Sequence, residues 1–239
     1  MTARRRLGLL GGTFDPIHFG HLDAAAAAQA ALRLDEVRLI PTHDPPHRPL
    51  DPRASVFHRF ALVALALEGP APLKASDVEV AREGPSYTVD TLRALHAEGW
   101  RPSQLFFIIG ADAFAEIATW HQFPAVLDAA HFVVIARPGA TLDAAVERTP
   151  ALRSRIRRAE DDDLDTRDTG VVLVAARTRD VSSTAIRARL AAQLSIDDLV
   201  PAPVARHIMT HGLYGADQEN GLRRGAVDDL HGENQRTQK

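Results

Sequence analysis

Five short apolar runs, separated by segments with helical character, constrain the fold of this chain more than any other feature of its sequence. Each run is continuous rather than alternating, which is typical of parallel strands in a sheet that helices cover on both faces. The predicted strands are Leu7–Leu10, Val37–Ile40, Leu105–Ile109, Phe132–Ile135 and Val171–Val174. The predicted helices are Phe19–Leu34, Ala54–Leu67, Tyr87–Ala97, Thr184–Gln193 and Val204–Thr210. We therefore expect an α/β protein with a doubly wound parallel sheet.

Composition and charge narrow the classes of function. The chain of 239 residues has 28 basic and 31 acidic side chains and a net charge of −3, whereas general nucleic-acid binders carry a basic face. It has no cysteine, which excludes disulfide scaffolds, thiolate zinc sites, iron–sulfur clusters and cysteine nucleophiles. No apolar run is as long as a membrane span, and the basic start lacks a signal-peptide core. We expect a cytoplasmic protein whose partners are neither nucleic acid nor membrane.

The domain organisation is predicted to be simple. Residues 1–215 have the length and pattern of a single α/β domain, while 216–239 are polar and without periodicity. We expect this last segment to be a disordered tail. Residues 45–49 contain three prolines and are predicted to form a loop. The densely charged stretch 153–168 is predicted to be a solvated helix end and loop.

The segment Gly11-Gly-Thr-Phe-Asp-Pro-Ile-His-Phe-Gly-His21 links the first predicted strand to the first predicted helix, where parallel sheets bind ligands. Its two leading glycines allow a ligand to approach the backbone closely. Gly20 leaves room for a phosphate at the free N–H groups of the first helical turn. His18 and His21 are three residues apart at a helix start and therefore share one face. The segment predicts an anion site, and it matches neither the dinucleotide fingerprint nor a Walker loop.

A second segment, Val181-Ser-Ser-Thr-Ala-Ile-Arg187, follows the last predicted strand. The hydroxyl groups of Ser182, Ser183 or Thr184 can cap a helix and bind phosphate. Arg187 lies about one turn further along, and its guanidinium fork suits phosphate oxygens. Such a cap is common by itself, but together with the first segment it predicts a second phosphate-binding element at the same edge of the sheet.

The two segments resemble the motifs of the nucleotidyltransferase superfamily and, more specifically, of the bacterial nicotinate-nucleotide adenylyltransferases. Further similar segments are Pro45-Pro-His-Arg48, Ser86-Tyr-Thr-Val-Asp-Thr-Leu92, Phe107-Ile-Ile-Gly-Ala-Asp112, Trp120-His121 and His131-Phe-Val-Val-Ile-Ala-Arg-Pro-Gly139. The resemblance covers about residues 5 to 214 and implies a Rossmann-like fold. It implies transfer of the adenylyl group of ATP to nicotinate mononucleotide, which gives nicotinate adenine dinucleotide and pyrophosphate in NAD biosynthesis.

The resemblance also implies a mechanism and the residues on the ATP side. The acceptor phosphate would attack the α-phosphate of ATP directly, with Mg²⁺ bound through the ATP phosphates and no dedicated protein metal site. The expected catalytic residues are His18, His21 and Arg187. The expected ATP-binding residues are Gly11, Gly12, Thr13, Phe14, Gly20, Gly110, Asp112, Ser182, Ser183 and Thr184.

On the acceptor side, the resemblance implies stacking and charge recognition. Trp120 would stack on the pyridine ring, although a core aromatic is the alternative for this residue. Thr88 and backbone N–H groups near Trp120 and His121 would donate to the nicotinate carboxylate. Arg137 would neutralise substrate charge, or lie in a turn and face solvent. The expected nicotinate mononucleotide-binding residues are Asp15, His47, Arg48, Ser86, Tyr87, Thr88, Trp120, His121 and Arg137.

Other functions remain open from the sequence. The acceptor could be nicotinamide mononucleotide or phosphopantetheine, and a non-catalytic nucleotide-binding regulator is an alternative from another class. A homo-oligomer is compatible with the sequence. The chain departs from the family pattern at Arg48, where lysine is common, and at His207, where the family often has tyrosine.

Overall fold

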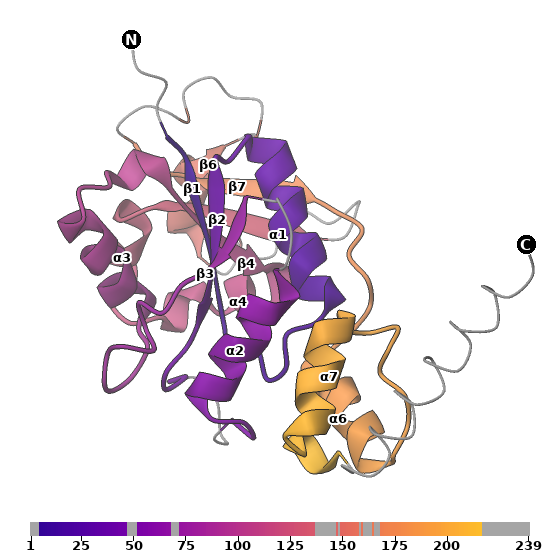
Figure 1. Ribbon diagram of the computed structural model, residues 1–239. Helices are drawn as coiled ribbons and strands as arrows, with labels where there is room; N and C mark the ends of the chain where they lie inside the picture. The colour runs from indigo at the N-terminus through magenta and orange to yellow at the C-terminus, as the bar shows by residue number, and fades with distance from the viewer. Residues whose placement is uncertain are drawn as a thin grey trace, which may run out of the picture.

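The computed structural model describes residues 5–46, 52–67, 72–136, 147, 149–157, 159, 164 and 168–216. They form a single parallel sheet with helices around it (Figure 1), and the strand order is β3-β2-β1-β4-β5-β7-β6. The strands are β1 (Leu7–Gly12), β2 (Glu36–Pro41), β3 (Leu73–Ala75), β4 (Leu105–Gly110), β5 (His131–Ala136), β6 (Ile156–Arg157) and β7 (Val171–Ala175). The α-helices are α1 (Phe19–Leu32), α2 (Val56–Ala66), α3 (Thr88–Ala97), α4 (Ala111–Ala115), α6 (Ser183–Ala191) and α7 (Ala202–Thr210).

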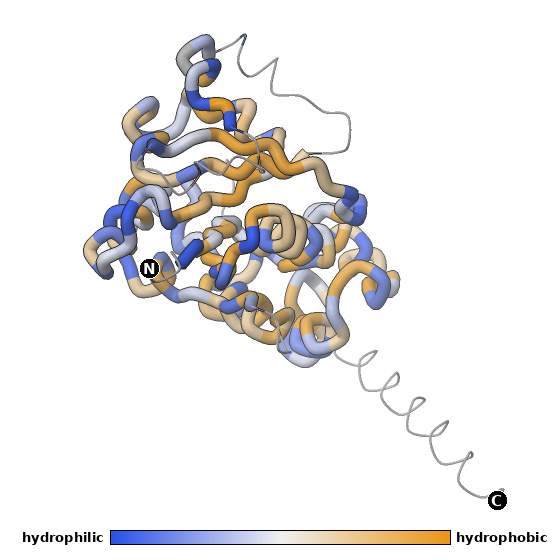
Figure 2. Tube along the Cα trace, turned by 90° about the horizontal axis from the view of Figure 1, so that it is seen from above, coloured by the Kyte–Doolittle hydropathy of each residue, from blue (hydrophilic) through white to orange (hydrophobic). Residues whose placement is uncertain are grey.

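Helices cover both faces of the sheet, as the continuous apolar strands predict. Successive strand residues point to opposite faces, so Phe106 and Ile108 of β4 join one core cluster while Phe107 and Ile109 join the other. The first cluster packs against α1, α2, α6 and α7, and the second against α3 and α4. In Figure 2 the strands form an orange, apolar centre, and the blue, hydrophilic segments lie around it. The α/β, Rossmann-like doubly wound fold is confirmed.

The strand order places a ligand-binding crevice next to β1. The chain builds the sheet outward from β1 through β2 to β3, then returns and adds β4 on the other side of β1. Ligands bind at this reversal point, outside the carboxyl ends of the strands. The carboxyl ends of β1 and β4 are Gly12 and Gly110. Both belong to segments that the sequence singled out.

The structure differs from the predicted elements mainly at the sheet edges. The two outermost strands, β3 and β6, have three and two residues and were not predicted. Strand β6 and the 3-10 helix Pro150–Arg155 occupy the start of a stretch expected to be a helix end and loop. The proline-rich loop is described only up to Pro46, and of the predicted tail only Ala216 is described, where it packs against the core.

Within the described segments, no helix is both long and apolar enough to cross a membrane.

Candidate active site

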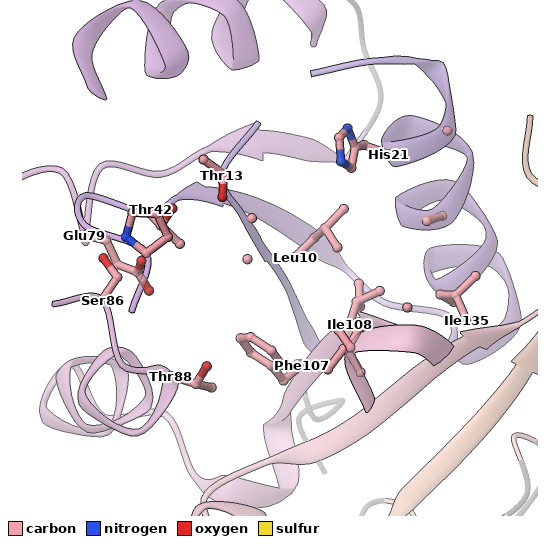
Figure 3. Close-up of a pocket in the computed structure, with 18 of the residues that line it drawn as sticks. Leu10, Thr13, His21, Thr42, Glu79, Ser86, Thr88, Phe107, Ile108 and Ile135 are labelled. Carbon is pink, nitrogen blue, oxygen red and sulfur yellow. The ribbon is translucent and has the colours of Figure 1, made fainter. Parts of the chain in front are cut away.

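A cavity of about 540 Å³ lies at the carboxyl ends of β1 and β4. Its floor is apolar and includes Leu10, Phe107 and Ile108, whereas its two ends are polar. Figure 3 shows His21, at the start of α1, on one side, with Ser86, Thr88 and Glu79 across the cavity from it. A long pocket with an apolar floor and two polar ends suits a ligand that carries charge at both ends.

The polar end beside α1 is built around two stacked histidines. The ring centroids of His18 and His21 are 3.7 Å apart and their planes differ by 23°, which confirms that the two side chains share one face. Phe14 packs edge-on against the His21 ring at 5.0 Å between centroids. The N–H of Phe19, in the first turn of α1, donates to the carbonyl of Leu199 at 3.0 Å.

Hydrogen bonding and burial define the state of each ring. The backbone N–H of His18 donates to Nδ1 of His21 at 3.3 Å, so a neutral His21 carries its proton on Nε2. Burial lowers the pKa of His18 to about 4, and the nearby Asp23 carboxylate opposes that shift. His18 is therefore uncharged near neutral pH. Its Nδ1 is buried without a hydrogen-bond partner among the described residues.

Gly20 lets the loop before α6 pack against this turn. A Cβ atom at Gly20 would lie 3.1 Å from Nδ1 of His18 and 3.1 Å from the carbonyl oxygen of Arg179. The sequence predicts that Gly20 leaves room for a phosphate. The structure shows that a side chain at this position would meet the His18 ring and the backbone at Arg179, and that Gly20 itself lines the cavity.

A buried arginine joins the strand ends that carry the site. Arg59 of α2 is 1% exposed, and its guanidinium donates to the carbonyls of Thr13 at 2.8 Å, Thr42 at 2.7 Å and His43 at 3.1 Å. Its Nε donates to the Ala54 carbonyl at 3.2 Å. These bonds tie the segment after β1 to the segment after β2, because the buried N–H groups of the arginine find their acceptors there.

Asp15 is a second structural hub. Its carboxylate accepts hydrogen bonds from the backbone N–H groups of Arg53 at 2.9 Å and Ala54 at 3.1 Å, and from the hydroxyl of Tyr214 at 2.9 Å. Burial and the Asp15 charge raise the pKa of Tyr214 well above its usual range. Arg187 donates through Nη1 to the Asp15 carbonyl at 2.7 Å. Asp15 therefore anchors the first and last parts of the domain to each other.

The segment 181–187, predicted to bind phosphate, caps its helix as predicted. Ser182 is the N-cap of α6, and its hydroxyl accepts from the N–H of Ala185 at 3.1 Å. The hydroxyl of Ser183 donates to the carbonyl of Pro16 at 2.9 Å, and Nη2 of Arg187 donates to the hydroxyl of Thr184 at 3.2 Å. The bond from Ser183 to Pro16, together with that from Arg187 to Asp15, fastens α6 to the segment before α1.

The other polar end of the cavity is the start of α3. Its N-cap, Tyr87, makes no side-chain cap hydrogen bond. The N–H of Asp90 donates to the Tyr87 carbonyl at 3.0 Å, so the N–H groups of the first two helical residues are the ones available to an acceptor. The hydroxyl of Thr88, the first residue of the helix, lies at the cavity wall. Tyr87 stacks on His121 at 4.3 Å between centroids, and Trp120 meets Phe107 edge-on at 5.9 Å. The N–H of Trp120, one of the expected donors, already donates to the carbonyl of Ile117 at 3.1 Å.

Glu79 lies beneath this end of the cavity. Thr91 donates to its Oε1 at 2.5 Å, and Arg82 donates to the Thr91 hydroxyl at 3.2 Å. Burial raises the pKa of Glu79, while hydrogen bonds from Thr91 and Ser86 oppose the shift. Ser86 in turn accepts from the N–H of His43 at 2.9 Å. The network ties the start of α3 to the segment after β2.

The structure brings twelve of the predicted residues together around the cavity. They are Gly11, Gly12, Thr13, His18, Gly20, His21, Ser86, Tyr87, Thr88, Gly110, Trp120 and His121. Other predicted residues are described but are not part of the lining: Phe14, Asp15, Asp112, Ser182, Ser183, Thr184 and Arg187. The remaining three, His47, Arg48 and Arg137, lie outside the described residues.

Sequence reasoning missed several lining residues. Arg179 and Thr178 reach the cavity from the loop before α6, and Thr42 and Glu79 reach it from segments after β2 and β3. No motif marks these positions. Their only signal is their place shortly after a strand, and β3 was too short to be predicted.

The described residues contain no group of three or more histidine, aspartate or glutamate side chains arranged to hold a metal ion. The polar end of the cavity beside α1 presents the imidazoles of His18 and His21 and the guanidinium of Arg179, whereas Mg²⁺ prefers oxygen ligands. These residues therefore fit a magnesium ion only if the substrate phosphates supply its ligands.

Comparison with known proteins agrees with the fold and the motifs. The sequence model of the cytidylyltransferase-like family matches residues 9–189. A curated relative from Pseudomonas fluorescens, named "Probable nicotinate-nucleotide adenylyltransferase", is 42% identical over 215 residues, which cover 89% of this chain and 98% of the relative. A relative of the same name from Bordetella petrii is 41% identical over 211 residues, covering 88% of this chain and 99% of the relative.

A solved structure of similar fold is that of Plasmodium falciparum nicotinic acid mononucleotide adenylyltransferase complexed with NaAD. It superposes with a TM-score of 0.65 at 15% identity and covers 90% of this chain and 99% of that chain. At this identity the likeness supports the fold alone. The family match and the curated relatives show that the chain belongs to the cytidylyltransferase-like nucleotidyltransferases and, within them, to the nicotinate-nucleotide adenylyltransferase family.

Proposed function

We propose that this enzyme transfers the adenylyl group of ATP to nicotinate mononucleotide and releases pyrophosphate. The observation that carries the proposal is a single cavity with a helix start at each end, α1 behind His18 and His21, and α3 behind Thr88. Helix N-termini attract anions. One end suits the phosphates, and the other suits the carboxylate of a nicotinate ring.

The reaction is a direct displacement at phosphorus. A phosphate oxygen of nicotinate mononucleotide attacks the α-phosphorus of ATP, and a new P–O bond forms. The bond from the α-phosphorus to the bridging oxygen of the β-phosphate breaks, and its electron pair leaves with pyrophosphate. Charge builds up on the phosphate oxygens, so positioning and hydrogen-bond donors provide most of the rate enhancement.

The two histidines are the proposed donors to the reacting phosphates. His21 carries its proton on Nε2 because Nδ1 accepts the His18 N–H, so it donates without needing a positive charge. His18 is neutral near pH 7 and nearly buried in the structure. A phosphate beside it favours its protonated form, since an opposite charge raises a histidine pKa. Binding therefore places an additional donor where the charge develops.

Arg187 and the α6 hydroxyls are proposed to hold the leaving pyrophosphate. In the structure Arg187 donates to the Asp15 carbonyl and to Thr184, so it must exchange at least one of these partners for a phosphate oxygen. Gly11, Gly12, Thr13, Phe14, Gly110 and Asp112 are proposed to contact ATP. Mg²⁺ would enter on the triphosphate and neutralise part of its charge.

The acceptor end is proposed to select a carboxylate over an amide. Thr88 and the first N–H groups of α3 are donors, and the half-buried Trp120 offers an aromatic face beside them. An amide would turn its own N–H₂ toward a donor and leave both unsatisfied, which costs binding free energy. His47, Arg48 and Arg137 are proposed to neutralise the acceptor phosphate. The proposed place of the reaction is the cytoplasm.

The test is pyrophosphate release with ATP and magnesium, measured with nicotinate mononucleotide and with nicotinamide mononucleotide at matched concentrations. We expect a preference for the acid of about a hundredfold, which corresponds to one mismatched donor pair. Equal rates would retain the reaction and refute the acceptor site. If neither acceptor gave pyrophosphate release, the proposed reaction would be refuted, and phosphopantetheine would be the next acceptor to assay.

A further inference from the structure

Arg179 places a positive charge at the polar end of the cavity beside α1, at a position that no motif marks. It lies in the loop between β7 and α6, three residues before the N-cap Ser182, and lines the cavity together with His18, Gly20 and His21. Its carbonyl oxygen packs against Gly20. The loop backbone is therefore held at the turn that carries the histidine pair, while the Arg179 side chain is about half exposed.

The side chain of Arg179 is held at the rim of the cavity by Asp23 of α1. The Arg179 Nε donates to Oδ2 at 2.9 Å and Nη2 donates to Oδ1 at 2.8 Å, and the backbone N–H of Arg179 also donates to Oδ2 at 2.9 Å. The guanidinium carbon lies 3.9 Å from the centroid of the Phe19 ring. The hydrogen bonds from Arg179 lower the pKa of Asp23, so the pair is ionised.

This arrangement is suited to exchange. The guanidinium of this pair is about half exposed, so its interaction with Asp23 is screened by salt. The fork of a guanidinium binds a phosphate with the same bidentate geometry as a carboxylate. A triphosphate at His18 and His21 brings several negative charges to the end of the cavity that Arg179 already lines. If the fork leaves Asp23, the backbone N–H of Arg179 can still donate to the Asp23 carboxylate, so the exchange does not require the loop to detach.

We propose that Arg179 binds the polyphosphate of the nucleoside triphosphate and that Asp23 competes with this ligand for the guanidinium. Asp23 therefore weakens triphosphate binding, and it keeps the Arg179 side chain beside Phe19 until a triphosphate binds. This inference rests on the proposed function for the position of the triphosphate, but it concerns binding rather than turnover.

The test measures binding of ATP and of inorganic tripolyphosphate by calorimetry, with adenosine as a ligand that lacks phosphate. The variants are Asp23→Asn, Arg179→Ala, the double variant, and Arg177→Ala as a matched loss of one exposed positive charge in the same loop. The amide introduced by Asp23→Asn keeps an oxygen that can accept the backbone N–H of Arg179, so the loop stays attached. Thermal unfolding confirms that each variant is folded.

We expect Arg179→Ala to weaken ATP and tripolyphosphate binding by about tenfold, the loss of one charge-assisted contact. Asp23→Asn should tighten both by a few-fold, and this gain should vanish in the double variant. Arg177→Ala and adenosine should show little change.

Three outcomes would overturn the proposal. Weaker binding in both Asp23→Asn and Arg179→Ala would mean that the pair only fastens the loop. An equal gain from Asp23→Asn with and without Arg179 would mean that only the removed negative charge matters. An equal loss in Arg177→Ala would reduce the effect of Arg179 to net charge. A failed adenylyl-transfer assay with normal tripolyphosphate binding would refute the proposed function and leave this inference standing.

Discussion

The part of the chain that the structure describes contains two groups of contacting histidines, and their surroundings differ. One is the stacked pair His18 and His21 at the carboxyl end of β1. The other consists of His58 in the first turn of α2 and His207 and His211 at the end of α7. In this second group Nδ1 of His58 lies 3.1 Å from Nε2 of His207, and the His207 and His211 rings are 4.3 Å apart.

The two groups share ring contacts but differ in burial and in position. His18 is 6% exposed and lines the cavity, whereas the second group joins two helices and lies outside the cavity lining. Burial lowers the pKa of both His18 and His207, and the charges of His211 and His58 add to the shift at His207. Contact between imidazoles therefore does not by itself indicate a functional site. What distinguishes the first group is its position at the strand ends, where it lines the cavity.

The largest expected difference between the two histidine groups is in turnover. We expect His21→Ala to lower kcat/KM for adenylyl transfer by about 10²- to 10⁴-fold, because it removes a donor to the transition state. The matched change His207→Ala should leave turnover within about twofold, because His207 contacts His58 and His211 but lies outside the cavity lining. Steady-state kinetics on both folded variants measures the difference. Similar losses in the two variants would mean that the groups do not differ in function.

The second effect is on the pH dependence of stability. His18 has a pKa of about 4 in the folded state and an ordinary value of 6.5, so the unfolded chain binds more protons between these values. Its contribution to stability is complete above pH 6.5 and is lost as the pH falls toward 4, by about 2–3 kcal/mol.

Urea unfolding at pH 7 and pH 4.5 measures this loss. We expect His18→Gln to lose less stability than the wild type on acidification, by that amount. His207→Gln should show a smaller difference, because His207 is more exposed than His18 and burial therefore shifts its pKa less. Parallel losses in the wild type and His18→Gln would contradict the burial argument.

The smallest expected effect tests how tightly the turn that carries the histidine pair is packed. A methyl group in Gly20→Ala would press on His18 and on the Arg179 carbonyl, both at 3.1 Å. We expect about 1 kcal/mol of destabilisation from overpacking and a fall in turnover of about tenfold as the rings shift. In Gly110→Ala the methyl group meets nothing within 4 Å, so the unfolding free energy should stay near that of the wild type. Equal destabilisation in both would mean that the packing at Gly20 is not tight.

The central strands were predictable because each is a continuous apolar run of at least four residues. The edge strands β3 and β6 were not, since three and two residues are too few to show a period and edge strands bury less apolar surface. Their pairing depends on the neighbouring strand, which the local sequence does not contain.

The histidine pair and the α3 start were predictable because motifs mark them. Arg179 and Glu79 were not, since each is a single charged residue whose role comes from partners distant in the chain. Asp15 shows a role that the motif did not predict. It belongs to the motif and is predicted to bind the acceptor, and in the structure its carboxylate accepts from two backbone N–H groups and from Tyr214. A motif thus marks residues that build a site as well as residues that contact its ligand.

The bond between Tyr214 and Asp15 joins residues 199 positions apart, and the Phe19 N–H reaches Leu199. The first and last parts of the domain therefore complete each other's hydrogen bonds at the turn before α1. During synthesis on the ribosome, the histidine turn emerges long before α7 and Tyr214 exist. Activity should accordingly arise only after α7 and Tyr214 have been translated. A protease that removes α7 should abolish activity, although α7 contributes no residue to the cavity lining.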